Sequence, residues 1–482
     1  MHFSIPDTQE FIETTGNAYL GYNVHINGLY HCTVRYKQLH NLHKQLMKDL
    51  DVPLPPFPPK KLFPLTITQQ EERRFSLEKY IQTIGQNSSI NNCELLNGFL
   101  LNAQLETAGE STENQSLDVY LMNDCKIILS VSAGENSGQV LRKLCRHIKL
   151  PDQYVSYFSL FIMCHEDDGT VNIVRKLQDF ESPIITQKNL HATGMRVVLG
   201  KSYWDPGYDL ELMNDPVAIN LLQMQAAAEI NRGWIPISSE MRDRLNHLQD
   251  NGDKAQYLDI AQSLKYYGYV QFAPCYCDYP QPGCRVLVAM GKHELNLRIL
   301  ETNDKESETT FKITRMHCWR ITTLHNGADK IEDNSDCSLE LSFEYLMARN
   351  QLQWITITSE QAILMSVCLQ AMIDELLIKN VGGSKSQEVS GKTWTYIMRD
   401  GVSTIVMGSS SMDNLSAIQD DEDINSSGKP EPIMRKLTER LSSITTKKSA
   451  DVKRTVVKID RKKTNCDTME NNAFHMIGDD DL

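Results

Sequence analysis

The sequence of 482 residues lacks any run of about 18 consecutive apolar residues, the length that a helix needs to cross a bilayer. Its first residues, MHFSIPDTQEF, lack the basic region and the apolar run of a secretory signal. Basic residues are not in excess, because 62 Asp and Glu outnumber 49 Lys and Arg and give a net charge of −13. Bulk electrostatics therefore should not draw the chain to nucleic acid, and no nucleic-acid partner is expected.

Catalytic motifs are absent as well. The sequence contains no G-x-S-x-G, H-E-x-x-H or calcium-loop pattern. Gly391-Lys392-Thr393 imitates the end of a phosphate-binding loop, but Ser386 stands where that loop requires glycine, and no strand leads into it. We therefore expect neither an enzyme nor a cofactor.

Cysteine usage points to a reducing compartment. Without a signal peptide, the 12 cysteines are expected to be reduced thiols of a cytoplasmic protein. Cys275, Cys277 and Cys284 lie close together, but no second pair of ligands follows at the spacing of a zinc site. No metal site is expected.

What the sequence does contain is a stretch, from Arg35 to Arg73, that combines cations with stiff backbone. RYKQLHNLHKQLMKDL carries leucines on one side of a predicted helix, and the prolines of PLPPFPPKKLF end that helix and favour an extended loop. Lys60 and Lys61 follow the loop, and Arg73 begins a second helical pattern. Separated cations on rigid supports suit a ligand with several phosphates, and Tyr36 offers a flat ring. A solvated basic face is the alternative.

The order of these motifs, R-Y before a helix, then P-P-x-P-P-K, then R-x-x-x-L-x-x-Y, resembles the phox-homology (PX) domain family. The resemblance implies that Arg35, Lys60 and Arg73 contact phosphatidylinositol 3-phosphate and that Tyr36 packs against the inositol ring. Lys37 departs from the Ser or Thr of many members, and this cation could strengthen binding or loosen selectivity. The candidate phosphoinositide-binding residues are therefore Arg35, Tyr36, Lys37, Lys60 and Arg73.

The first two units predicted along the chain mix strands and helices. Residues 1–107 form an α+β unit whose hairpin turns at Asn27-Gly28. Residues 108–115 are polar and mark a boundary. Residues 116–205 follow with two strands, a helix at 137–148 and further strands in YFSLFIM and MRVVLG, a ubiquitin-like order.

The remaining chain is predicted to be helical, then β-rich, then disordered. In residues 206–273, Asp215 caps a helix, Pro216 fits its first turn and Gly233 fits its end. Residues 274–381 hold several strands and one long helix started by Ser359, as in a PTB/PH-type domain. Residues 382–482 are poor in aromatics and are expected to be mostly disordered. Further helices are expected at 239–249, 253–267 and, within the tail, 432–442.

The full order is an α+β multidomain chain, a PX domain followed by ubiquitin-like, helical and PTB-like lobes of a FERM-like module. This order, with MHFSIP, PPFPPKKLF, YVSYFSLF, KSYWD, RMHCWR, LQWITIT and IGDDDL, resembles the PX-FERM sorting nexin family. The resemblance implies a monomeric adaptor on early-endosome membranes that recycles receptors to the cell surface. It also implies N-P-x-Y or N-x-x-Y tails of the low-density lipoprotein receptor family and β-integrins as cargo, and Retriever/Commander as a partner. The alternative is a FERM-type linker between membrane and cytoskeleton.

A cargo site is expected at the edge of the PTB-like lobe, where an extended peptide can add a strand. The resemblance places Trp319 in the peptide-binding strand. Alternation of the sequence puts Phe311, Ile313, Trp319 and Ile321 on one face, so a plain core role for Trp319 is the alternative. Candidates on the facing helix are Met365, Cys368 and Met372.

The end of the chain carries two further candidate motifs. Asn471-Asn472-Ala473-Phe474 has the N-x-x-F form of a cargo motif, which predicts that Asn471 and Phe474 compete with cargo for the site near Trp319. A chance occurrence is the alternative. The acidic, apolar-tipped end is expected to bind a basic groove of Retriever/Commander; its residues are Ile477, Gly478, Asp479, Asp480, Asp481 and Leu482.

Overall fold

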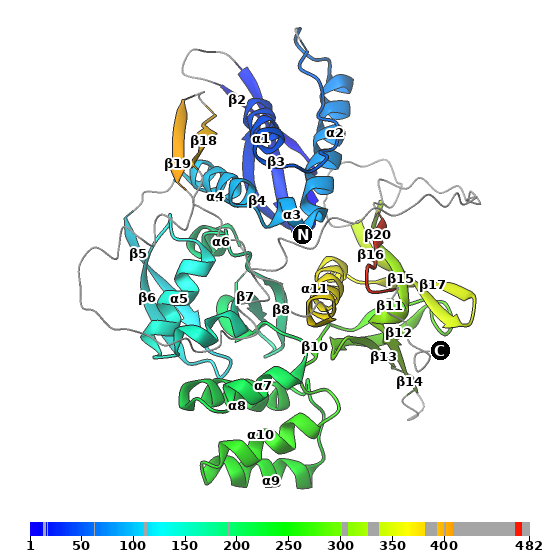
Figure 1. Ribbon diagram of the computed structural model, residues 1–482. Helices are drawn as coiled ribbons and strands as arrows, with labels where there is room; N and C mark the ends of the chain where they lie inside the picture. The colour runs from blue at the N-terminus through cyan, green and yellow to red at the C-terminus, as the bar shows by residue number, and fades with distance from the viewer. Residues whose placement is uncertain are drawn as a thin grey trace.

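The computed structural model describes most of the chain in four units and two short segments beyond them (Figure 1). The described residues are 1–12, 16, 18–61, 63–109, 113–190, 193–300, 307–325, 337–380, 393–399, 402–407 and 468–474. None of their helices is both long enough and apolar enough to cross a membrane.

The N-terminal unit packs helices on a small antiparallel sheet in which β3 pairs with β1, β2 and β4. The predicted hairpin is confirmed, because Asn27 and Gly28 take φ values of 49° and 84° between β3 and β4. Both predicted helices of the basic stretch are present as α1 and α2, but α2 begins at Ile67, six residues before the predicted start at Arg73. The elements are β1 (Phe3–Ser4), β2 (Thr8–Ile12), β3 (Ala18–Ile26), β4 (Leu29–Arg35), α1 (Tyr36–Asp49), α2 (Ile67–Gln86), α3 (Ser88–Asn91) and α4 (Glu94–Ala108).

A histidine lies in the core of this unit. The side chain of His31 is 1% exposed, and its Nε2 lies 3.1 Å from the carbonyl oxygen of Leu100. The ring stands edge-on to Phe180 of the next unit, with ring centroids 5.7 Å apart. Burial lowers the pKa of His31 from 6.5 to about 4.

This histidine predicts acid-sensitive stability. The unfolded chain binds its proton near pH 6.5 and the folded chain only near pH 4, so the unfolded state holds more protons between these values. The free energy of unfolding should therefore fall as the pH falls from 6.5 to 4, by up to about 3 kcal/mol from this residue. Urea melts of His31→Gln should show a shallower pH slope, whereas His247→Gln, at an exposed position, should keep the parent slope. Equal slopes for parent and His31→Gln would contradict this assignment.

The second unit has the ubiquitin-like arrangement that the sequence predicted, with a mixed sheet in the order β6-β5-β9-β7-β8. The parallel pair β5–β9 joins the two ends of the unit. Helix α5 packs on this sheet, and the short helix α6 was not predicted. The elements are β5 (Asn114–Tyr120), β6 (Lys126–Ser132), α5 (Ser137–His147), a 3-10 turn (Asp152–Tyr157), β7 (Phe158–His165), β8 (Val171–Lys176), α6 (Pro183–Asn189) and β9 (Met195–Lys201).

The third unit is helical. The Asp215 side chain accepts hydrogen bonds from the N–H groups of Val217 and Ala218, so it caps α8 as predicted. Gly233, with φ of 74°, lies just past the end of α8. Its elements are a 3-10 turn (Pro206–Tyr208), α7 (Asp209–Leu212), α8 (Pro216–Asn231), α9 (Ser239–Asp250) and α10 (Lys254–Ser263).

The fourth unit is the predicted PTB-like sandwich, and its long helix α11 lies against β15 and β16 (Figure 1). Its sheet runs β14-β13-β12-β11-β17-β16-β15, and β10 pairs with β12. The elements are β10 (Val270–Gln271), β11 (Cys275–Cys277), β12 (Cys284–Gly291), β13 (Glu294–Ile299), β14 (Ser307–Lys312), a 3-10 turn (Ile313–Arg315), β15 (Met316–His325), β16 (Cys337–Ala348), β17 (Gln351–Thr358) and α11 (Ala362–Asn380).

Two segments of the region predicted to be disordered are ordered, and each packs on a unit that lies far from it in the sequence. The hairpin β18 (Thr393–Ile397) and β19 (Ser403–Met407) packs on the N-terminal unit against α1 and α4. Strand β20 (Thr468–Glu470) adds to β15 of the fourth unit (Figure 1). The prediction of disorder was wrong for these segments. It rested on the composition of the tail, which carries no information about a surface elsewhere in the fold on which a segment can pack. The predicted helix at 432–442 lies outside the described residues.

Candidate functional site

A cleft of about 810 Å³ in the N-terminal unit brings the predicted lipid-binding residues together. Arg35 comes from the end of β4, Tyr36 and Lys37 from the first turn of α1, Lys60 from the proline loop and Arg73 from α2. Glu10 is the single carboxylate among the described residues that line it. The cations among them are Arg35, Lys37, Lys44, Lys60 and Arg73. The cleft is therefore suited to an anion.

Aromatic rings hold the two arginines of the cleft in place. The Arg35 guanidinium carbon lies 4.2 Å from the centre of the Tyr19 ring, and that of Arg73 lies 4.5 Å from the centre of the Tyr36 ring. The Tyr36 hydroxyl donates to the carbonyl oxygen of Pro58 at 2.7 Å, which ties the proline loop to α1. The two rings therefore restrain the orientation of both arginines at the cleft.

Some polar groups of the cleft are available to bind a ligand. Within the part of the chain that the structure describes, Nη2 of Arg73 is buried and has no hydrogen-bond partner. Lys37 and Lys60 are exposed at the cleft. Burial, and then the cations of Lys44 and Lys60, lower the pKa of His40. A phosphate oxygen would satisfy the buried N–H groups and relieve the repulsion among the cations.

Sequence reasoning missed several residues of this cleft. Tyr19 and Tyr22 reach it from β3, and Lys44 and His40 lie one or two turns along α1 from the predicted residues. The i, i+4 spacing of Tyr36, His40 and Lys44 on one helix face was the available signal. The tyrosines of β3 had no such signal, because their position depends on strand pairing.

The second candidate site is the edge of β15, which the chain's own strand β20 occupies. The two strands pair antiparallel, with Cys318 opposite Glu470, Trp319 opposite Met469 and Arg320 opposite Thr468. An added strand of this kind satisfies backbone groups that an open edge would expose.

The segment after β20 is held by a buried asparagine. Asn471 is 4% exposed, and its Nδ2 donates to the carbonyl oxygens of Ile313 at 2.8 Å and Met316 at 2.6 Å. Its Oδ1 accepts from the N–H of Ala473 at 2.8 Å, which fixes a tight turn. The Phe474 ring then lies 4.9 Å from the His317 ring, centre to centre. Asparagine and phenylalanine of the N-x-x-F pattern are therefore the residues that seat this segment.

Trp319 lies under the edge of the sheet. Its side chain is fully buried, as are those of Phe311 and Ile313, and its indole N–H donates to the hydroxyl of Ser366 at 2.9 Å. This placement agrees with the core alternative, so the side chain contributes packing and the strand backbone contributes the pairing with Met469. A role of Trp319 in cargo binding stays a prediction.

The candidates on α11 belong to the same buried cluster as Met469 and Ala473 of the seated segment, and their role in cargo binding stays a prediction. Met365 and Met372 are fully buried in the core, and Cys368 lines a separate cavity beside Lys176 of the second unit. Ser366, which sequence reasoning missed, contacts both Trp319 and the Met469 sulfur, the latter at 3.6 Å. The helix face that meets β20 is therefore that of Ser366, whose small polar side chain gives no periodic signal.

A bulge in β15 places the side chains of His317 and Cys318 together opposite Glu344. Their potential metal-ligand atoms lie within 4.8 Å of one another. His317 Nδ1 already lies 2.6 Å from the Glu344 carboxylate, and its ring meets Phe474. We assign this group to the seating of the N-x-x-F segment.

Comparison with known proteins follows the division into units. The PX domain family matches residues 22–103, the F1 lobe of the sorting nexin 17/27/31 FERM domain matches 115–204, the F2 lobe of sorting nexins 17 and 31 matches 205–265, and the sorting nexin 17 FERM C-terminal domain matches 268–377. Sorting nexin-17 of Homo sapiens is 39% identical over 489 aligned residues, covering 100% of both chains. The chain belongs to the sorting nexin 17 family.

Other members of the family are similar over most of the chain. Sorting nexin-17 of Danio rerio is 44% identical over 81% of this chain and 84% of its own length. Sorting nexin-31 of Homo sapiens is 33% identical over 79% of this chain and 86% of its own. The resemblance to PX-FERM sorting nexins is confirmed, and the chain belongs to a family of sorting adaptors. We refer to its units below as the PX domain and the F1, F2 and F3 lobes.

Proposed function

We propose that this sorting nexin 17 family member is an endosomal cargo adaptor. The PX cleft binds phosphatidylinositol 3-phosphate on the cytoplasmic side of early endosomes, and the edge of β15 in the F3 lobe binds N-P-x-Y or N-x-x-Y/F tails of receptors. The adaptor thereby diverts receptors of the low-density lipoprotein receptor and β-integrin classes from degradation to recycling. The observation that carries this proposal is the chain's own N-x-x-F segment seated on β15.

The geometry of the PX cleft supports the lipid. A monophosphorylated inositol presents one dianionic phosphate and a ring with hydroxyls, which matches arginines on two sides of an aromatic wall. Phe63, at the cleft, and Ile67, at the start of α2, are each 82% exposed. Apolar side chains beside a headgroup site are suited to enter the membrane next to the lipid.

The seated segment supports a peptide site of defined chemistry. Strand pairing with β15 accepts many sequences, whereas the cage of carbonyl oxygens around Asn471 requires an amide donor. A hydrophobic or aromatic residue three positions later meets the His317 ring. Receptor tails with asparagine at the first position and an aromatic at the fourth fit both requirements.

Because the chain's own segment occupies the peptide site, cargo has to compete with that segment for binding. The residues between β19 and β20 are 408–467, so the connection is shorter than the ninety or so residues expected from the end of α11. A tether of about this length corresponds to an effective concentration of roughly 0.1–1 mM. Cargo must displace the segment, and displacement releases the acidic residues 477–482, which lie outside the described part of the chain, to Retriever/Commander.

The competition predicts a gain of cargo affinity when the segment is weakened. Asn471→Ala combined with Phe474→Ala should tighten binding of an N-P-x-Y peptide by about 3- to 10-fold, because the peptide no longer competes with a tethered segment. Isothermal titration calorimetry on the full chain measures the effect. Asn472→Ala, at an exposed position of the same turn, is the matched control and should bind like the parent.

Two further measurements complete this test. A chain that ends at residue 463 keeps the 393–407 hairpin but loses β20, and it should bind the peptide like the double variant. Retriever captured by the full chain should rise with peptide concentration. Equal peptide affinity of parent, double variant and truncated chain would refute the competition, and capture independent of peptide would refute the linkage to Retriever.

The alternative function, a FERM-type membrane–cytoskeleton linker, makes a different expectation. Such a linker should co-sediment with actin filaments or their partners and bind N-P-x-Y peptides no better than scrambled ones. Calorimetry with both peptides and co-sedimentation on the same preparation separate the two functions. We expect specific peptide binding and no actin co-sedimentation.

A further inference from the structure

The hairpin formed by β18 and β19 follows the F3 helix in the sequence but packs on the PX domain beside α1 and α4 (Figure 1). The side chain of Gln45 in α1 forms two hydrogen bonds with the backbone of the hairpin, as a neighbouring strand would. The Gln45 Oε1 accepts from the N–H of Thr395 at 3.0 Å, and its Nε2 donates to the carbonyl oxygen of Thr395 at 2.6 Å. The ring of Tyr396 is buried 5.7 Å from that of Phe99 in α4, centre to centre. The hairpin is thus anchored to the PX domain by both polar and apolar contacts.

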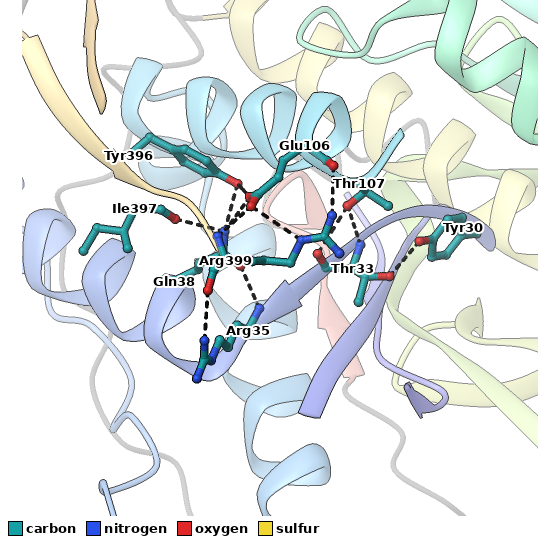
Figure 2. A network of polar contacts seen from close by, with 9 residues as sticks. All are labelled: Tyr30, Thr33, Arg35, Gln38, Glu106, Thr107, Tyr396, Ile397 and Arg399. Atoms are coloured by element: carbon teal, nitrogen blue, oxygen red, sulfur yellow. Dashed lines mark hydrogen bonds and ion pairs between the residues drawn. The ribbon is translucent and has the colours of Figure 1, made fainter. Parts of the chain in front are cut away.

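A single carboxylate near the end of α4 holds Tyr396 of β18 and Arg399, which follows this strand (Figure 2). Glu106 accepts from the backbone N–H of Arg399 at 2.6 Å, from the Tyr396 hydroxyl at 2.8 Å and from Gln38 Nε2 at 2.8 Å. The Arg399 guanidinium returns to the same residue and donates to its carbonyl oxygen at 2.8 Å. Burial, and then Glu106, raise the pKa of Tyr396, so its hydroxyl stays protonated and donating.

This network reaches the lipid cleft at Arg35. The Arg399 carbonyl oxygen accepts from Nη1 of Arg35 at 2.9 Å (Figure 2). Gln38 links the same two places, because its Oε1 accepts from the Arg35 N–H at 2.8 Å and its Nε2 donates to the Ile397 carbonyl oxygen at 2.9 Å. The residue expected to hold the lipid phosphate is therefore oriented by a segment 364 positions later in the chain.

The chemistry of this contact suits positioning. A carbonyl oxygen is neutral, so this contact fixes the plane of the guanidinium without itself adding a negative charge. A carboxylate in the same place would orient Arg35 and also cancel its charge. Arg35 is further restrained on its face by Tyr19, at 4.2 Å. An arginine held in this way loses less rotamer freedom when it binds.

We propose that the 393–407 hairpin is part of the phosphoinositide site, in which Arg399 and Tyr396 act as positioning residues for Arg35. The proposal rests on the proposed lipid function of the cleft. It implies that a PX domain cut out of this chain at residue 109 lacks one wall of the polar network around Arg35. Recognition of the headgroup phosphate then depends on a segment that lies beyond the FERM lobes in the sequence.

The test compares full-length chains on two kinds of vesicle. One chain has residues 391–408 replaced by a Gly/Ser linker of equal length, a second carries Arg399→Ala, and the control carries Val402→Ser at an exposed turn position. Vesicles contain phosphatidylcholine with either phosphatidylinositol 3-phosphate or phosphatidylserine. The linker chain should bind the phosphoinositide vesicles roughly 3- to 10-fold more weakly, by loss of preorganisation. Its binding to phosphatidylserine vesicles should not change, since the charge of Arg35 remains.

A double substitution separates positioning from simple stability. In an Arg35→Lys background, the linker replacement should cause no further loss of phosphoinositide binding, because the guanidinium on which it acts is gone. Phosphoinositide affinity within twofold of the parent for the linker chain, or an equal loss on both vesicles with a lowered melting temperature, would overturn the proposal. If the parent chain itself does not prefer phosphoinositide vesicles, the proposed lipid function is wrong and this inference falls with it.

Discussion

Replacing Arg35 by alanine should abolish recruitment of the chain to vesicles that carry phosphatidylinositol 3-phosphate. The substitution removes the cation that lies between Tyr19 and the Arg399 carbonyl at one wall of the cleft. Charge-assisted hydrogen bonds to phosphate are stronger than neutral ones, and no neighbouring cation can replace both the charge and the geometry. Vesicle co-sedimentation should fall to the level seen without the lipid. Each charged hydrogen bond contributes ~1.5–3 kcal/mol, so we expect the affinity for these vesicles to fall by at least about 100-fold.

Two further variants calibrate this result. Lys60→Ala removes an exposed cation of the same cleft and should weaken binding less, because exposed pairs contribute little. Lys126→Ala, an exposed lysine of the F1 lobe outside the cleft, should leave binding unchanged. Undiminished binding of Arg35→Ala, with an unaltered melting curve, would mean that the cleft is not the lipid site.

Replacing Trp319 by alanine should destabilise the F3 lobe by about 3–5 kcal/mol, because the side chain is fully buried and its removal leaves a large cavity. The lobe should melt at a lower temperature, and peptide binding should be lost together with the fold. Differential scanning calorimetry and peptide titration on one sample measure both effects.

The conservative series identifies the role of the indole. Trp319→Phe keeps most of the volume but loses the hydrogen bond to Ser366, and Ser366→Ala leaves the indole N–H without this acceptor. Each should cost about 1–3 kcal/mol, less than the alanine variant. If Trp319→Ala melts like the parent and yet fails to bind peptide, the side chain contacts cargo directly and the core assignment is wrong.

Much of the PX cleft could be predicted because its signals are local. The proline loop has to be extended, α1 has to begin after Arg35, and both features fix where the cations emerge from the backbone. The same holds for the Asn27-Gly28 turn and the Asp215 cap, where one or two residues decide the local conformation. Such preferences act within a few residues and so can be derived from the sequence alone.

The sequence by itself thus determined the order of the units and the first hairpin and helix of the PX domain, and its resemblance to PX domains supplied the five candidate residues that line one cleft. Only the tertiary structure decided that Trp319 is core, that Ser366 faces the added strand, and that residues 393–407 return to Arg35. The reason is physical. Alternation and helical period report which face of an element is apolar, but the partner of that face is chosen by the packing of the whole chain. The polar, aromatic-poor composition of the tail therefore did not indicate that one of its segments packs on the PX domain and another pairs with β15.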